Sequence, residues 1–401
     1  MRKQISNVAQ ASLSEHNRSC VLRHLYNNGI SSRAQIAKAL GLTPAAITKI
    51  TARLLEAGVI EETGDIEGSK NRRSIGLKLD SDRFHIIGVK FARSLVEIGV
   101  FDLNGTTLHL EDLPEVSDST IDSTLTTIHE RIEDLLSGDS SIVAIGMAVP
   151  GPYLRNAGHT AVVSSMQSWR RVNFLEEFST AFSVPVFVEQ DARAGVLAQY
   201  LFADHDDCDT MAYYLVGEGV GLGVLDHGKL INGSLGAATE IGHVSIDVNG
   251  RPCDCGNVGC LERYCSAVAI HQDINQSHII PQSDAMGHSQ ACNALFAKAA
   301  QGDTQAQDMV RAIGRIIGYG CVTIVNAFNP ERIILGDIVP QAGEPLMQAV
   351  RDIIHERVIN ELASTPSVEV SKLPTDAAVS GAAAVAITEF LDRPSMFFDV
   401  T

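Results

Sequence analysis

Long apolar runs are missing from this sequence of 401 residues: none reaches the roughly 18 residues that a membrane-spanning helix needs. The first ten residues, Met1 to Gln10, are polar and lack the apolar core of a secretory signal peptide. We therefore expect a protein that is not inserted in a membrane and that acts in the cytoplasm. The composition, 45% hydrophobic and 20% charged, is typical of a soluble globular protein with two or three domains.

Positive charge is scarce beyond the first 80 residues. Residues 1–80 hold 12 Lys and Arg against 7 Asp and Glu, a net charge of +5. Residues 81–401 hold the other 19 of the 31 basic residues against 41 of the 48 acidic ones, a net charge of −22. A basic head on an acidic body predicts that only the head binds a polyanion such as nucleic acid.

The pattern of residues 1–80 predicts three helices followed by a two-stranded wing. Ser32 begins the second helix with a capping box. Thr43 caps the third helix, and Pro44 fills its first position, where a missing N–H costs nothing. The strands of the wing are expected at Val59–Thr63 and Ser74–Leu79.

The third helix has an apolar side, with Ile47, Ile50 and Leu54 at helical spacing. Its opposite side is small and cationic, which lets a helix approach DNA closely and contact phosphates and base edges. The predicted DNA-contacting residues are Thr43, Ala45, Thr48, Lys49 and Arg53 on the helix and Lys70, Arg72 and Arg73 on the wing. The alternative, a three-helix bundle used only for packing, explains neither the basic wing nor the charge contrast.

Strands and helices alternate through residues 81–401, which predicts an α/β body of two lobes with a cleft between them. We place the first lobe at residues 81–190 and the second at residues 191–401. The last predicted helix, at about residues 379–391, is a candidate to pack back on the first lobe.

Three of the eight cysteines, Cys253, Cys255 and Cys260, crowd together a few residues after His243. Three thiolates and one imidazole fill a tetrahedral zinc site and leave no open position, so the expected Zn²⁺ is structural. The alternative is a histidine and three cysteines buried without a metal. The Cys-x-Cys-Gly-x-x-Gly-Cys spacing favours the metal, because it is poor in apolar packing groups.

Several unusual segments occur here in the order found in the ROK family of repressors, open reading frames and sugar kinases. They are Leu215–Val224, Gly233, Gly236, Glu240-Ile-Gly-His243 and the segment from Cys253 to Glu262. The chain resembles that family over nearly its whole length, and its head is similar to those of the glucose and N-acetylglucosamine repressors. The resemblance implies an α/β protein with an N-terminal winged helix-turn-helix and a two-lobed, actin-like sugar-kinase body.

The resemblance also implies a sugar site. By similarity with ROK kinases, Asp191, Glu240, His243 and Glu262 fall on positions that bind sugar hydroxyls, which carboxylates and imidazoles do well. His243 would then use one nitrogen for zinc and the other for the sugar. Further positions near the sugar are Gly151, Gln190 and Ser165, where the kinases usually have Asn at the last two. A single carboxylate is ordinarily a solvated surface group, and it is the matched set that favours a pocket.

The phosphate side departs from the kinases. They carry Asp-x-Gly-Gly-Thr where this chain has Lys90-Phe-Ala-Arg-Ser94, and Gly-Gly where it has Gly336-Asp337. The acid and the glycines that phosphoryl transfer needs are therefore missing, and a carboxylate at Asp337 repels phosphate. We predict that the protein is not an enzyme.

The predicted function is a repressor of carbohydrate uptake or metabolism genes, controlled by a sugar or sugar phosphate between the lobes. Two alternatives remain: a repressor controlled by a sugar-transport protein, and a ROK sugar kinase with a regulatory head. The expected partners are a double-stranded DNA operator, the sugar effector and further copies of the chain in a homodimer or homotetramer.

Overall fold

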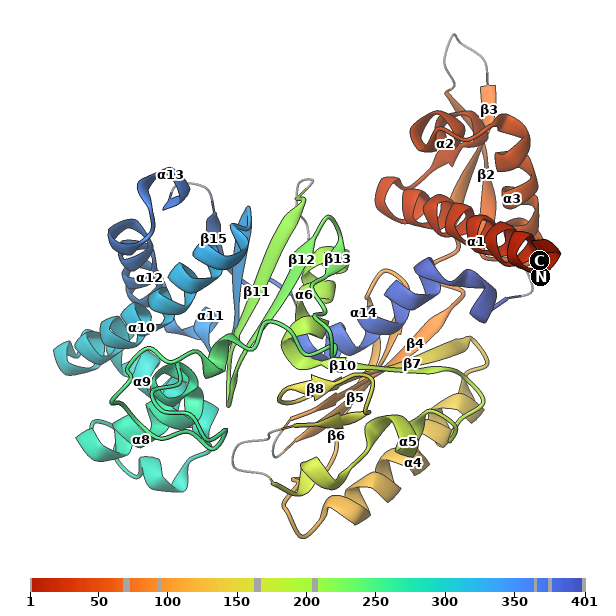
Figure 1. Cartoon of the computed structure of the whole chain (residues 1–401). Coiled ribbons are helices and arrows are strands. Elements are labelled where there is room, and N and C mark those ends of the chain that lie inside the picture. The colour runs from red at the N-terminus through yellow and green to blue at the C-terminus, as the bar shows by residue number, and fades with distance from the viewer. Residues whose placement is uncertain are drawn as a thin grey trace.

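The computed structural model describes residues 2–67, 73–92, 95–161, 167–203, 208–363, 366–373 and 377–398 (Figure 1). A three-stranded sheet lies in the head, two five-stranded sheets organise the body, and a two-stranded hairpin, β8–β9, accompanies the first of these. No helix in the described segments is long and apolar enough to cross a membrane.

The head combines three helices with a sheet of order β1-β3-β2. Its elements are α1 (Arg2–Asn28), β1 (Ser31–Ser32), α2 (Arg33–Leu40), α3 (Pro44–Glu56), β2 (Ile60–Glu67) and β3 (Arg73–Leu79). The predicted capping box is present: the Ser32 hydroxyl accepts from the Gln35 N–H at 3.3 Å, and the Gln35 side chain accepts from the Ser32 N–H at 2.7 Å. Gly41 ends α2 with a φ of 64°, which glycine adopts without strain.

The first body sheet has the order β10-β7-β4-β5-β6, in which β4, β7 and β10 are parallel and β4, β5 and β6 form an antiparallel meander. Helix α4 packs on one face, where its Ile128 and Ile132 join the sheet's core. The elements are β4 (His85–Phe91), β5 (Val96–Asp102), β6 (Thr107–Asp112), α4 (Ile121–Gly138), β7 (Ile142–Val149), β8 (Tyr153–Leu154), β9 (His159–Thr160), η2 (Gln167–Arg171), α5 (Phe174–Phe178) and β10 (Val186–Gln190).

The second body sheet has the order β13-β12-β11-β14-β15. Helix α6 contacts β11 and β12, and helices α10 and α12 pack together over the large core of this part of the chain. The elements are α6 (Asp191–Phe202), β11 (Thr210–Val216), β12 (Val220–Asp226), β13 (Lys229–Leu230), η3 (Ile241–His243), α7 (Glu262–Cys265), α8 (Ala267–Ser277), η4 (Ser283–Ala285), α9 (His288–Ala300), α10 (Thr304–Phe328), β14 (Arg332–Asp337), α11 (Val339–Ala342), α12 (Glu344–Arg357), α13 (Asn360–Ala363) and β15 (Ser367–Val370).

Helix α14 (Ala377–Asp392) contacts both the body and the head (Figure 1). It packs against α6 and against β4 and β7 of the first sheet. The approach is close: a Cβ added to Gly146 of β7 would lie 1.7 Å from the Ala382 carbonyl oxygen. Glycine in the sheet and the run of alanines in α14 therefore depend on each other, because larger side chains on either side would separate the helix from the strands.

The head rests on the C-terminal end of α14. Phe390 and Leu391 share one hydrophobic core cluster with Val21 and Leu22 of α1. The Arg23 guanidinium forms an ion pair with Asp392 at 2.5 Å. The last short helix, η5 (Pro394–Met396), also contacts α1. Apolar packing and an ion pair thus join the head to the body.

Candidate functional site: an exposed recognition helix, an acidic cleft and a metal cluster

Helix α3 presents the face that the sequence predicted for DNA. Thr43 caps it by accepting from the Ala46 N–H at 3.2 Å, and Ile47 and Leu54 are fully buried. The predicted DNA-contacting residues of this helix, Thr43, Ala45, Thr48, Lys49 and Arg53, are all exposed. The Arg53 guanidinium lies 3.1 Å from the Glu56 carboxylate on the same helix, so its charge is partly neutralised locally.

The wing is formed by β2 and β3, whose register shifts between Glu62 and Asp65. Lys70 and Arg72 lie outside the described residues, and Arg73 begins β3. The Arg33 guanidinium at the start of α2 contacts both the Thr51 hydroxyl, at 3.1 Å, and the Glu62 carboxylate, at 3.0 Å. These contacts fix the wing's first strand against the helices.

A cleft lies beside the carboxyl ends of β4, β7 and β10. The structure brings the predicted sugar-binding residues together, since Gly151, Gln190, Asp191, Glu240, His243 and Glu262 all line it. Ser165 lies outside the described residues.

Asp191 stands where β10 meets α6, because Gln190 caps that helix. The Gln190 side-chain oxygen accepts from the Arg193 N–H at 2.9 Å, and its amide nitrogen donates to Asp191 Oδ1 at 2.6 Å. The same Oδ1 accepts from the Ala192 N–H at 2.7 Å. Gly221 leaves the necessary room, since a Cβ there would lie 2.9 Å from the Gln190 amide nitrogen.

The environment of the cleft strongly perturbs Glu240. Burial raises its pKa from an ordinary 4.5 to about 8, with further contributions from Asp191 and Glu262 against the lowering effect of Arg193. Glu262, which is largely buried, accepts from the Val220 N–H at 3.1 Å. Three carboxylates therefore converge on a poorly hydrated space, which is costly unless donors or a cation face them.

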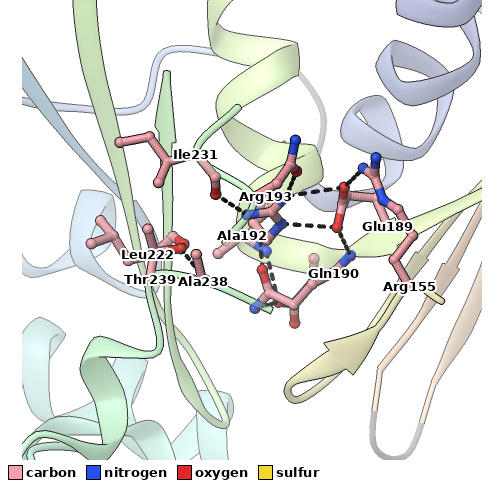
Figure 2. Close-up of polar contacts among 11 residues, drawn as sticks. Arg155, Glu189, Gln190, Ala192, Arg193, Leu222, Ile231, Ala238 and Thr239 are labelled. Atoms are coloured by element: carbon pink, nitrogen blue, oxygen red, sulfur yellow. Dashed lines mark hydrogen bonds and ion pairs between the residues drawn. The ribbon is translucent and has the colours of Figure 1, made fainter. Parts of the chain in front are cut away.

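A buried ion-pair network supports this side of the cleft. Figure 2 shows Glu189 between the guanidinium groups of Arg155 and Arg193, and both Glu189 and Arg193 are 0% exposed. Arg193 Nε donates to Glu189 at 2.9 Å, and its Nη1 donates to the Ile231 carbonyl oxygen at 2.5 Å. Arg193 thereby links β10, which leads into Asp191, to the loop that leads toward Glu240.

The predicted metal ligands are also close together. Ligand atoms of His243, Cys253, Cys255 and Cys260 all lie within 4.8 Å of one another. The Cys255 and Cys260 sulfurs are 3.6 Å apart, and Cys253 Sγ is 3.8 Å from His243 Nδ1. Zn–S bonds of about 2.3 Å in a tetrahedron require sulfurs about 3.8 Å apart, so this set fits zinc.

The loop around the cluster is shaped by glycine. Gly256 and Gly259 have φ angles of 91° and 73°, and a Cβ on Gly259 would lie 1.7 Å from the Asp247 carbonyl oxygen. Burial and the neighbouring thiols of Cys253 and Cys255 raise the pKa of Cys260 to about 12. A cation is therefore needed to hold this sulfur as the thiolate that zinc binds.

The lining of the cleft also includes residues that replace the kinase phosphate motifs. Lys90 and Asp337 both line the cleft. Lys90 forms an ion pair with Glu97, its direct neighbour across β4 and β5, at 2.7 Å. Arg93 and Ser94 lie outside the described residues.

Two features of the site escaped the sequence analysis. The Glu189–Arg193 pair was visible only as charges four residues apart, a spacing equally common on exposed helices. Glu218, in the turn between β11 and β12, also lines the cleft. It lies inside the Leu215–Val224 motif, where the glycines carried the recognition.

Comparison with known proteins identifies the two parts of the chain. The ROK family profile matches residues 86–389, and a winged helix-turn-helix DNA-binding profile matches residues 21–61. The chain is 30% identical over 380 residues to the DNA-binding transcriptional dual regulator NagC of Escherichia coli K12, covering 92% of each protein. It is 26% identical over 386 residues to the xylose repressor of Bacillus subtilis, covering 95% of this chain and 97% of that one.

Solved structures agree. A ROK family transcriptional regulator, homologue of the E. coli MLC protein, has a TM-score of 0.80 at 26% identity, covering 97% of this chain and 99% of its own. A ROK glucokinase from Streptomyces griseus, in complex with glucose and AMPPNP, has a TM-score of 0.65 at 25% identity and covers 75% of this chain and 98% of its own. The predicted fold class is confirmed, and so is the prediction of a regulator and not an enzyme, because the relatives that match the chain over nearly its whole length are named regulators and repressors. The relatives that match nearly its whole length are named transcriptional regulators or sugar repressors. The chain therefore belongs to the ROK family.

Proposed function

We propose that this protein is a sequence-specific DNA-binding repressor of carbohydrate uptake or metabolism genes, controlled by a sugar or sugar phosphate bound in the cleft. The observation that carries the proposal is the convergence of Asp191, Glu240 and Glu262 in one cleft, in a chain whose recognition helix is exposed. Sugar hydroxyls can donate hydrogen bonds to such carboxylates. As a regulator bound to chromosomal DNA, the protein would act in the cytoplasm.

The route from cleft to head runs along α14. Ala378 lines the cleft near the first turn of this helix, and Asp392 at its end holds Arg23 of the head. Sixteen helical residues span about 24 Å. A sugar that closes the cleft would shift α6 against α14 and so re-aim the head, because close-packed elements move as units.

Zinc is the cofactor that the cluster would hold. His243, Cys253, Cys255 and Cys260 would occupy all four positions, which leaves the ion a structural role and no open site for catalysis. With Nδ1 of His243 on the metal, Nε2 remains for the cleft that this residue lines. The metal would thus orient one wall of the sugar site.

Assembly follows from how such heads bind DNA. Helix-turn-helix proteins bind two half-sites about one helical turn apart, or a multiple of it, which requires at least two copies. We propose a homodimer or homotetramer whose half-site spacing changes when the cleft closes. Release from DNA on sugar binding is the direction that such a change favours.

Two measurements on the same protein test the proposal. Calorimetry with hexoses, pentoses, amino sugars and their phosphates identifies the ligand, for wild type and for Glu240→Gln. Fluorescence anisotropy with a duplex selected from a random pool then measures DNA affinity with and without that ligand. A change of about fivefold or more corresponds to a coupling of about 1 kcal/mol and supports the proposal.

The proposal fails if no sugar binds wild type, or if Glu240→Gln binds the best sugar equally well. Control by a sugar-transport protein then becomes the better account. That second function predicts that such a protein, and no free sugar, releases the DNA.

A further inference from the structure

Residues 231–239 form the segment between β13 and Glu240, here named the Glu240 loop. The segment has no regular secondary structure. Gly236 and Thr239 have φ angles of 75° and 71°, in the left-handed region. Threonine is β-branched and rarely adopts that region, so contacts with the rest of the protein must hold it there. Because Glu240 is the next residue, the contacts that fix this loop also decide where Glu240 stands.

Arg193 of α6 holds the first residues of the Glu240 loop (Figure 2). Its Nη1 donates to the Ile231 carbonyl oxygen at 2.5 Å, and its Nη2 donates to Asn232 Oδ1. The side chain is 0% exposed, and its Nε donates to Glu189 at 2.9 Å. The guanidinium is planar, so its donors point in fixed directions and fix the groups that accept from them. Arg193 therefore ties the start of the loop to the end of β10.

Arg155 holds the middle of the Glu240 loop. It lies in the turn between β8 and β9, and its Nη2 donates to Glu189. Gly236 packs directly on Arg155, since a Cβ on Gly236 would lie 2.7 Å from the Arg155 Cβ. The stem of Arg155 thus lies against the loop while its charged end is anchored on Glu189.

Glu189 joins the two arginines. It is 0% exposed and accepts from both guanidinium groups, and its Oε1 also accepts from the Gln190 N–H at 3.0 Å. It lies in β10, two residues before Asp191. One buried network of charge-assisted hydrogen bonds therefore connects the strand that carries Asp191 with the loop that ends at Glu240.

We propose that Arg155 and Arg193, joined through Glu189, are positioning residues that hold Glu240 opposite Asp191 and thereby set the sugar affinity of the cleft. This inference rests on the proposed function, because it concerns the ligand site of the same cleft. Arg155, Glu189 and Arg193 are not among the described residues that line the cleft, so they act through the acids that do. Hydrogen bonds weaken steeply when their geometry is lost, so a loosened loop weakens the contacts of a sugar that reaches both acids.

Calorimetry on the full-length protein with excess zinc tests the inference. The ligand is whichever of glucose, N-acetylglucosamine, xylose and their phosphates binds the wild type most tightly. Arg155→Met keeps an apolar stem and removes the charge, and it should weaken binding about fivefold or more. Arg155→Lys should bind within about twofold of wild type, because an ammonium can still meet the Glu189 carboxylate. Arg155 reaches Glu189 through Nη2, and its buried Nε has no partner in the described structure.

Arg193→Lys should behave in the opposite way and weaken binding about tenfold or more, because an ammonium cannot replace the planar fork that reaches Glu189, Ile231 and Asn232. Arg131→Met is the matched control, since it removes a guanidinium of similar exposure, 36% against 41%, that pairs with Glu111. It should leave the sugar affinity unchanged. Zinc content and near-UV circular dichroism report whether each variant is folded, and the two Arg155 variants decide if Arg193→Lys does not fold.

A folded Arg155→Met that binds the sugar as tightly as wild type overturns this inference and leaves the proposed function standing. An Arg155→Lys that binds as weakly as Arg155→Met does the same, because the contact with Glu189 is then not what matters. An equal loss in Arg131→Met would show a general effect of lost ion pairs and also overturn it. If no sugar of the panel binds wild type, the proposed function fails and this inference fails with it.

Discussion

Glu240 should make the protein less stable as the pH rises, and Glu240→Gln should remove that loss. The folded-state pKa is about 8 and the ordinary value is 4.5. Between these values the folded protein holds a proton that the unfolded chain has released. Unfolding therefore releases a proton, and rising pH favours it. The stabilisation that this bound proton gives the folded state is fully present below pH 4.5 and is lost as the pH rises through 8.

The magnitude follows from the same values. One pKa unit corresponds to about 1.4 kcal/mol. From pH 5 to pH 8, the wild type should lose about 2 to 4 kcal/mol of unfolding free energy relative to Glu240→Gln, which carries no charge at any of these pH values. Bound zinc does not remove the effect, because Zn²⁺ with three thiolates has a net charge of about −1 and opposes a second negative charge nearby.

The assay is urea unfolding at pH 5, 6, 7 and 8, followed by circular dichroism in the presence of excess zinc. Other titrating groups are common to both proteins, so the difference between them isolates residue 240. Glu115→Gln, which removes an exposed carboxylate, should follow the wild-type curve. Parallel curves for wild type and Glu240→Gln from pH 5 to pH 8 would refute the reasoning, and the cleft would then be better hydrated than its burial implies.

Four further predictions concern other parts of the molecule. Cys255→Ser should lose its zinc and lower the melting temperature of the body, whereas Cys292→Ser, outside the cluster, should keep the metal; atomic absorption on both proteins checks this. Arg72→Ala/Arg73→Ala should weaken binding to all duplexes alike and reduce the slope of log affinity against log salt by about one per lost phosphate contact, as measured by anisotropy in a salt series. Asp392→Asn should loosen the ion pair with Arg23 and reduce the effect of the sugar on DNA affinity while calorimetry finds sugar binding unchanged. Purified protein with ATP and any sugar that binds should show no phosphorylation in a coupled assay, and turnover abolished by Asp191→Asn would contradict this.

Local signals allowed much of the fold to be predicted. The cap at Thr43, the capping box at Ser32 and the apolar spacing of Ile47 and Leu54 depend on neighbours a few residues away, and each has the predicted place. The edge strand β6 gives a weak sequence signal, because none of its residues is buried and its apolar residues, Leu108 and Leu110, are exposed. The full extent of α1 was missed as well, since its first turns have no apolar period.

The candidate site was predictable where a motif holds its residues at fixed spacing. The metal cluster spans 18 residues, and its geometry follows from the chain's short reach between ligands. The Lys90–Glu97 ion pair was not predictable, because sheet register decides it and register is not encoded in a short segment. The sequence alone therefore does not reveal that Lys90 forms an ion pair with Glu97.

The cleft's carboxylates link stability to control. Burial, Asp191 and Glu262 all raise the pKa of Glu240, so an ionised Glu240 destabilises the cleft. On the proposed function, a sugar would remove that penalty in a closed arrangement in which its hydroxyls reach Glu240, Asp191 and Glu262. The sugar would therefore bind the closed state more tightly than the open state. Such a difference in affinity is what lets a ligand shift a conformational equilibrium. Because Arg193 joins the Glu240 side of the cleft to β10 and α6, and α6 packs on α14, the same closure reaches the helix that carries the head. On the proposed function, this acidic cleft is the feature that would make DNA affinity respond to a sugar.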